Sequence, residues 1–181
     1  MAVLKYQPPR NLKHRAVESG QAIVEFTIVA TIMLIFFLML IDFGRAIYDL
    51  EVMSGLSRQG SNLASRGTDL SDAVSAVISG DAPLNLSQNG EVIITAVSNA
   101  QGVNTISAQQ SLGGTSNTSQ IGTYSPTRSV TARLPSSASE MIQANQTIYV
   151  TEIFYSFRPI TPIGNILHVV MPSTLYQAAY F

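Results

Sequence analysis

The chain has 181 residues, of which 46% are apolar and 12% charged, and it contains no cysteine. The length fits one domain with an appendage. Without cysteine, disulfides, thiol chemistry and cysteine-ligated metal sites are excluded, and a net charge of −1 gives no electrostatic footprint for nucleic acid. Residues 1–20 carry four basic side chains and one acidic one, whereas residues 21–181 carry six basic and ten acidic ones. The charge therefore changes sign where the most apolar stretch begins.

Residues 26–41 contain no charged side chain. Extended back to Ala22, the apolar run has twenty residues, and only Glu25 interrupts it. A helix of that length spans about 30 Å, the thickness of a hydrocarbon core. The run is apolar on all sides, whereas a soluble amphipathic helix carries an apolar stripe. We therefore expect a transmembrane helix with its ends at Ala22 and Ile41, followed directly by Asp42 and Arg45.

The flanks of this run predict its orientation. Four basic side chains precede it, so the positive-inside rule puts the N-terminus in the cytoplasm and the residues after Ile41 outside. One alternative is the buried core helix of a soluble protein. Another is a cleavable signal peptide, whose apolar region has about 7–15 residues and ends at a small-residue cleavage site. The run here is longer, and residues 42–45 offer no such site.

Glu25 places a carboxylate inside the apolar edge, where ionised groups are costly: on the order of 3 kcal/mol at the bilayer centre and less near its edge. One interpretation is that the carboxylate reaches the headgroup layer. The other uses Gly20, because a cut after it would give Gln21 a new α-ammonium group. Glu25 lies four residues further along the same helical face. Pairing with that ammonium, in the same subunit or in the next, would offset the desolvation of both ions.

Three stretches together resemble one protein family: residues 20–26 (GQAIVEF), the apolar run, and residues 41–48 (IDFGRAIY). They resemble the TadE-like family, which are minor pilins or pseudopilins of the Tad (Flp) pilus and tight-adherence secretion apparatus of bacteria. The resemblance covers residues 19–66, with a fainter echo in residues 149–162. Many relatives have a proline early in the membrane helix, where this chain has residues 29–31 (VAT), so the resemblance does not carry over a helix kink.

The resemblance implies processing by a prepilin peptidase, a membrane aspartyl protease that acts on the cytoplasmic side and would cut between Gly20 and Gln21. Residues 1–20 would then be a leader, and Glu25, followed by Phe26, would be the fifth residue of the mature chain. The implied partners are the bacterial inner membrane, the prepilin peptidase, other Tad pilins or pseudopilins, and the Tad assembly platform. The C-terminal domain would be periplasmic or extracellular.

Helical periodicity continues beyond the membrane. It predicts one transmembrane and stem helix over residues 21–66, closed by Gly67 at the C′ position. Arg45 is spaced to pair with Asp42 and Asp49, at i−3 and i+4. The expected apolar face holds Ile47, Leu50, Met53, Leu56, Gly60, Leu63 and Ala64, and the expected polar face holds Asp49, Glu51, Arg58 and Asn62.

Residues 67–181 predict a small extracytoplasmic α+β domain whose antiparallel sheet packs on the stem helix. Residues 147–157 carry large apolar groups on both faces, so this strand is expected to be central. Residues 110–123 are expected to form a polar loop. The expected helices cover residues 70–79 and 136–142, the second with a capping box of Ser137 and Glu140. Further strands are expected over residues 91–97, 103–109, 129–133 and 173–180.

The sequence offers little for catalysis. His14 lies in the expected leader, and His168 stands between apolar neighbours, where a packing role is expected. Known nucleophile, zinc, phosphate and dinucleotide motifs are not found. We therefore predict no catalytic residue, metal or cofactor and favour a non-enzymatic pilin-like subunit. The alternatives are a permanently anchored, uncleaved assembly scaffold related to TadG-like proteins, and an anchored periplasmic enzyme that uses His168.

Overall fold

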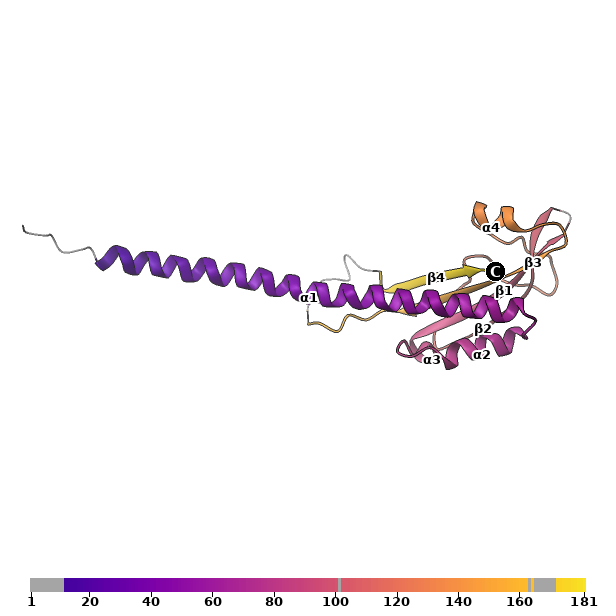
Figure 1. Cartoon of the computed structure of the whole chain (residues 1–181), viewed down its shortest axis with the longest axis horizontal. Coiled ribbons are helices and arrows are strands. Elements are labelled where there is room, and N and C mark those ends of the chain that lie inside the picture. Colours follow the sequence, from indigo (N-terminus) through magenta and orange to yellow (C-terminus); the bar gives the residue numbers. More distant parts are fainter. Residues whose placement is uncertain (1–11, 101, 163, 165–171) are drawn as a thin grey trace, which may run out of the picture.

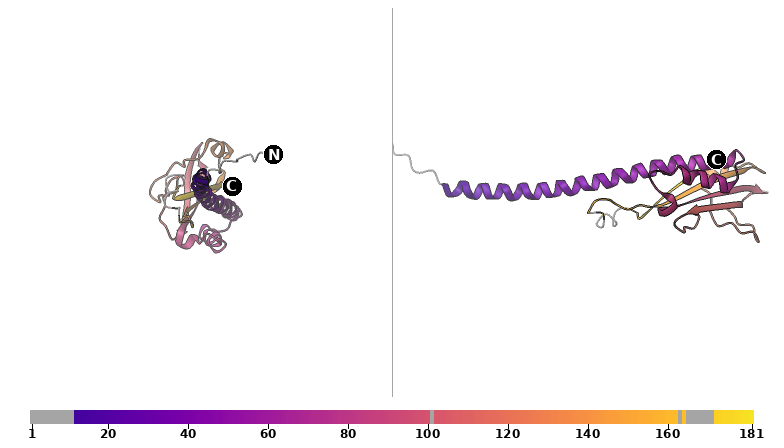
Figure 2. Two further views of the ribbon diagram at one scale, coloured as in Figure 1. Left: turned by 90° about the vertical axis from the view of Figure 1, so that its left-hand side faces the viewer. Right: turned by 90° about the horizontal axis from the view of Figure 1, so that it is seen from below.

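The structure, a computed structural model, describes residues 12–100, 102–162, 164 and 172–181. A single 54-residue helix, α1 (Leu12–Ser65), runs as a rod that carries the rest of the chain at its far end (Figure 1). It begins before the expected residue 21 and ends one residue before the expected Arg66. Figure 2 shows that it curves gently without a sharp kink, as expected for a stem without proline.

The end of α1 is set by a glycine. Gly67 has a φ of +89°, the left-handed conformation that glycine adopts without strain. The Gly67 N–H donates to the Ala64 carbonyl at 3.0 Å, and the Thr68 N–H donates to the Leu63 carbonyl at 3.2 Å. These two bonds define a Schellman motif. The predicted C′ role of Gly67 is confirmed, and the motif turns the chain back toward the sheet.

The domain is built on a four-stranded antiparallel sheet with the order β2-β1-β3-β4. Its strands are β1 (Gly90–Ala100), β2 (Val103–Gly113), β3 (Thr147–Ser156) and β4 (Thr174–Tyr180). The β3 strand pairs with β1 and β4, so its predicted central position is confirmed. The expected α+β architecture, a long apolar helix followed by a small antiparallel sheet, is what the structure has.

One face of the sheet packs against α1 and α2 (Leu70–Ser79) (Figure 1). The apolar stripe of α2 enters this core through Ala73, Val74 and Val77, because residues spaced three and four apart share a helical face. A second apolar cluster lies on the opposite face of the sheet, since its member Val150 alternates on β3 with the α1-facing Thr151. Its residues come from the sheet, from the connection after β2, and from Ile142 after α4 (Ser136–Met141): Val97, Ile106, Ile121, Ala132, Ile142, Ile148 and Val150.

Several local predictions are wrong. Residues 110–113 extend β2 instead of starting the polar loop. Residues 129–133 form no strand and contribute only an isolated bridge between Thr131 and Thr105. The N-cap of α4 is Pro135, and no side chain caps it, so the capping box is not formed. The short α3 (Leu86–Asn89) was not expected. Each miss lies in a polar connection, where contacts with the sheet decide the local structure.

Candidate functional site: the stem and its junction with the domain

The helix α1 has two parts with opposite surroundings. Its most apolar window of 18 residues has a mean hydropathy of 2.6, and none of that window is buried. Large side chains such as Phe26, Ile32 and Phe36 are at least 60% exposed. From Asp42 onward the same helix packs against the domain (Figure 1). An exposed apolar rod of this length requires lipid or other helices around it.

The predicted processing and pairing residues all lie at the free end of this rod. Gly20, Gln21, Ala22, Glu25 and Phe26 are exposed and helical. The Gln21 side-chain amide donates to Glu25 Oε1 at 3.1 Å, so the spacing does bring these two residues together on one helical face. In the uncut chain the carboxylate of Glu25 thus has a neutral partner. The cut after Gly20 and the pairing with an α-ammonium group stay predictions.

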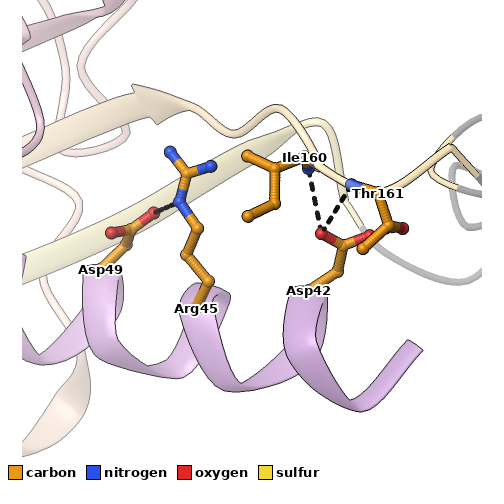
Figure 3. Close-up of polar contacts among 5 residues, drawn as sticks. All are labelled: Asp42, Arg45, Asp49, Ile160 and Thr161. Atoms are coloured by element: carbon orange, nitrogen blue, oxygen red, sulfur yellow. Dashed lines mark hydrogen bonds and ion pairs between the residues drawn. The ribbon is translucent and has the colours of Figure 1, made fainter. Parts of the chain in front are cut away.

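The far end of the apolar run meets the domain at Asp42, which is fully buried (Figure 3). One of its carboxylate oxygens accepts hydrogen bonds from the backbone N–H groups of Ile160 (3.0 Å) and Thr161 (3.3 Å). The other accepts a hydrogen bond from the Thr161 hydroxyl. The prediction that Asp42 pairs with Arg45 is wrong, because Asp42 binds residues of the connection after β3 instead. Ile41, one residue earlier, is half exposed, and Leu38 and Met39 are partly buried, so the helix passes from bare to packed within about one turn.

Arg45 and Asp49 form the next layer of this junction (Figure 3). Arg45 Nε lies 3.9 Å from Asp49 Oδ2, so the predicted i,i+4 pair is present. The guanidinium also lies over the Phe157 ring, 5.9 Å from its centre, within the range of a cation–π contact. Asp49 is buried, against the expectation that it faces solvent. Burial raises the pKa of its carboxyl above the ordinary value, and the positive charge of Arg45 opposes this.

The buried face of α1 explains these corrections. Asp42, Ala46, Asp49 and Met53 recur at spacings of four and three, so they lie on one face and all are buried. Ile47, expected on the apolar face, is half exposed. The signal that was missed is that both aspartates fall in register with the apolar stripe, whose other predicted members Met53, Leu56, Gly60 and Ala64 are buried as expected.

A second polar contact fixes α1 to the middle of the sheet. The Ser61 hydroxyl lies 2.9 Å from Thr151 Oγ1 and 3.0 Å from the Ala179 carbonyl oxygen, and it accepts the Thr151 N–H at 3.0 Å. The preceding residue must be small: a Cβ on Gly60 would lie 2.8 Å from Thr151 Oγ1 and 3.0 Å from Val77 Cγ2. The half of α1 that follows Asp42 therefore packs closely against β3 and α2.

The residues considered for catalysis do not form a site in the part of the chain that can be described. His168, on which the enzyme alternative rests, lies outside the described residues, as does the side chain of His14. Within the described ranges, no three acidic or histidine side chains are grouped closely enough to hold a metal ion. Residues 163 and 165–171 also lie outside the described part, whereas Ile160, in the connection after β3, is exposed.

Comparison with known proteins adds one match. The family described as TadE-like protein matches residues 20–62. The stem of this chain is therefore similar to the TadE-like family, as the sequence predicts. The matched segment starts at Gly20, includes the whole bare part of α1, and ends within the part that packs on the sheet. No curated protein and no solved structure matches the chain. The TadE-like family associates the chain with the Tad pilus system, and the single long apolar helix suggests a one-pass membrane anchor.

Proposed function

We propose that this chain is a pilin-like subunit, or pseudopilin, of a Tad (Flp) pilus or tight-adherence secretion apparatus, and that it is not an enzyme. It is held in the bacterial inner membrane with its N-terminus in the cytoplasm and the domain of residues 67–181 outside. The observation that carries the proposal is the TadE-like helix itself, which is exposed from Gly20 to Phe37, partly covered at Leu38 and Met39, and packed on the domain from Asp42 onward.

This division suits a subunit that changes its surroundings. The bare part first faces lipid and then faces the stems of neighbouring subunits, two environments of similar polarity, so the exchange needs no refolding of the domain. The junction supports the same role, because the hydrogen bonds of Asp42 and the contact of the Arg45 guanidinium with the Phe157 ring join the domain to the stem at the end of the apolar run. A pull on the stem would thus be passed to the domain.

Processing by a prepilin peptidase would remove residues 1–20. The scissile bond between Gly20 and Gln21 lies inside α1, so the helix must open locally before a peptidase can reach the backbone. Glycine favours this opening, because it lowers helix stability by about 1 kcal/mol relative to alanine. No side chain packs around Gly20: a Cβ built there meets nothing within 4 Å.

Glu25 would act after the cut. It now accepts a hydrogen bond from the Gln21 side chain, which is a neutral partner. The new α-ammonium group of Gln21, in the same subunit or in the next, would provide a charge for the carboxylate at the same level of the membrane. A pair with the ammonium group of the next subunit forms only inside an assembly, so that form of the pairing favours incorporation of the stem.

The proposal is tested in two steps. N-terminal sequencing of the membrane-extracted protein should begin at Gln21, and a start at Met1 or Ala2 would contradict the processing. In the second step, Glu25→Ala and Glu25→Gln should both leave processing intact and reduce piliation, because both remove the charge. Glu51→Ala, which removes an exposed acid from the packed half of the same helix, is the matched control. Normal piliation by both Glu25 variants would refute the pairing role.

The second candidate is the uncleaved assembly scaffold of the same system. It is favoured by the helix α1 itself, which continues through the cleavage region to Leu12 without a break. Mass spectrometry of sheared pili and of the membrane fraction separates the two. A chain that starts at Gln21 in sheared pili supports the pilin-like subunit, whereas a full-length chain confined to the membrane supports the scaffold.

A further inference from the structure

The connection between β2 and α4, residues 114–135, is long for a segment without helix or strand. Connections longer than about 12–15 residues are uncommon in compact domains and are often functional. This one crosses the face of the sheet that α1 leaves uncovered, since it is bonded to Glu91 and Glu152, which alternate with the α1-facing residues Val92 and Ile153. It is therefore a separate feature from the stem.

Buried carboxylates hold this connection in one conformation. Glu152, fully buried on β3, accepts hydrogen bonds from the Gln120 N–H (2.8 Å), the Ser119 hydroxyl and the Tyr176 hydroxyl (3.0 Å). Glu91, also buried, accepts the Asn117 N–H. Each of the two carboxylates thus accepts a hydrogen bond from a backbone N–H group of the connection, which forms no strand of the sheet.

A third anchor comes from β2. The Gln109 side chain donates to the Gly122 carbonyl at 2.9 Å and accepts the Tyr124 N–H at 3.0 Å. The Arg133 N–H closes the segment by donating to the Ile121 carbonyl at 2.8 Å. With these bonds the irregular segment is preorganised, and a ligand bound to it does not have to order it first.

The anchored segment lines an open pocket of about 330 Å³, within the volume range of small-ligand sites. Two arginines line it, Arg128 and Arg133, together with the hydroxyl-bearing Thr118, Ser119, Thr123 and Thr131. No carboxylate is among the described residues that line it. Glu152 is fully buried and bonded to Ser119, Gln120 and Tyr176, so its charge is not presented to the pocket.

The charge of the domain makes this grouping specific. Residues 67–181 carry only three basic side chains, Arg128, Arg133 and Arg158, against six acidic ones. Two of the three basic groups therefore line one pocket in a domain that is otherwise acidic. Guanidinium groups bind carboxylates and phosphates through paired hydrogen bonds, and hydroxyl groups suit a ligand that itself carries many hydroxyls.

We propose that this pocket binds an acidic saccharide, with Arg128 and Arg133 on its carboxylate and the threonine hydroxyls on its ring hydroxyls. The site needs neither processing nor assembly of the stem, so it stands or falls independently of the pilin-like role.

The test uses the full chain in detergent micelles and isothermal titration calorimetry with trigalacturonate as the probe. Trigalacturonate should bind, and maltotriose, which lacks the carboxylates, should not. Arg128→Ala and Arg133→Ala should each weaken binding about tenfold or more, as expected for the loss of a charge-assisted hydrogen bond. Arg128→Lys, which keeps the positive charge but loses the paired hydrogen bonds of the guanidinium, should weaken trigalacturonate binding less than Arg128→Ala does. Arg158→Ala, which removes the third cation of the domain outside the pocket, should leave it unchanged.

Three results would overturn the proposal. One is the absence of trigalacturonate binding by the unmodified chain. Another is equal weakening by Arg158→Ala, which would mean that binding follows overall charge. The third is inorganic phosphate binding as tightly as trigalacturonate, which would reduce the pocket to a simple anion site. Because Arg128 and Arg133 are exposed, their variants are expected to fold, and an unchanged near-ultraviolet circular dichroism spectrum is the check.

Discussion

The two halves of α1 are one continuous helix with two different sequence designs. In the half that ends at Ile41, apolar side chains point in every direction, and all the large ones up to Phe37 are exposed. In the half that begins at Asp42, one face is buried and includes two aspartates, while Glu51 and Arg58 remain outside. The first pattern fits surroundings that are apolar on all sides. The second fits a protein core on one side and water on the other.

The comparison also shows where a polar group can be buried. Asp42 is fully buried, and its carboxylate accepts hydrogen bonds from the two backbone N–H groups of Ile160 and Thr161, which need an acceptor. Among the described residues, Glu25 in the bare half accepts a hydrogen bond from the side chain of Gln21, four residues earlier in the same helix. A carboxylate is therefore satisfied by the folded domain in the packed half, whereas in the bare half the proposed assembly would provide its charged partner.

The largest expected effect on stability comes from comparing the same substitution, methionine to alanine, in the packed half and in the bare half of α1. Met53, in the packed half of α1, is fully buried in the core of the domain, whereas Met33, in the bare half, is about half exposed. Met53→Ala should lower the free energy of unfolding of the domain by about 2–5 kcal/mol, because it removes buried methylenes and leaves a cavity. Met33→Ala should change it by less than about 0.5 kcal/mol.

Thermal unfolding of the detergent-solubilised chain, followed by the near-ultraviolet circular dichroism of its seven tyrosines, measures both values. Equal effects of the two substitutions would contradict the division of the helix.

The next test addresses the junction. Asp42→Ala should cost about 1–3 kcal/mol, since it leaves the N–H groups of Ile160 and Thr161 without their acceptor. Hydrogen exchange at these two amides should rise before the sheet amides are affected. Glu51→Ala is the control, because it removes an exposed acid from the same helix and should leave both exchange and stability unchanged. Protected amides at 160 and 161 in the Asp42 variant would show that the carboxylate does not hold this connection.

Smaller effects are expected at two glycines of the packed half, where alanine should change the unfolding temperature in opposite directions. A Cβ at Gly60 would collide with Thr151 and Val77, whereas a Cβ at Gly55 meets nothing within 4 Å. Alanine is the better helix former by about 1 kcal/mol. Gly55→Ala should therefore raise the unfolding temperature. Gly60→Ala should lower it, because the buried, branched side chain of Thr151 has little room to move. A stabilising Gly60→Ala would mean that the stem does not sit as closely on β3 as the structure has it.

Most of the architecture could be predicted from the sequence, because it rests on long periodic patterns. The helix end at Gly67, the central β3 and the pairing of β4 with it follow from glycine, β-branched and aromatic residues in simple registers. The start of α1 at Leu12 was missed, since residues 12–20 carry no apolar stripe that would extend the helix.

The polar contacts could not be predicted in the same way. The pair of Arg45 with Asp49 was predicted because it is local, but Asp42 was wrongly assigned to Arg45 as well, because neighbours in sequence are all that a helical pattern reveals. The partners that bury Asp42, Ile160 and Thr161, are more than 110 residues away. Likewise nothing in residues 110–123 indicates that Ser119 and Gln120 reach a buried Glu152. Long-range hydrogen bonds of this kind depend on the folded sheet and leave no periodic signal.

The smallest expected effect concerns Asp49 and depends on pH. Burial raises the pKa of the Asp49 carboxyl in the native state, so the native chain holds this proton more tightly than the unfolded chain does. The stability linked to the protonated form is fully present below the unfolded-state pKa of about 4, and it is lost as the pH rises through the raised native value. Asp49→Asn, which carries no charge at any pH, should match the original chain at low pH and exceed its stability at pH 7 by less than about 1 kcal/mol.

Arg45 provides the matched background for this test. Its guanidinium lies 3.9 Å from Asp49 and opposes the rise in the carboxyl pKa, so the gain from Asp49→Asn at pH 7 should be larger when Arg45→Gln is already present. Unfolding temperatures of the four chains at low and neutral pH give the coupling between the two residues directly. A loss of stability on Asp49→Asn at pH 7 would mean that the ion pair outweighs the burial of its carboxylate. The buried face of the stem would then hold the Asp49 carboxylate because the guanidinium of Arg45, one turn earlier in α1, compensates its charge.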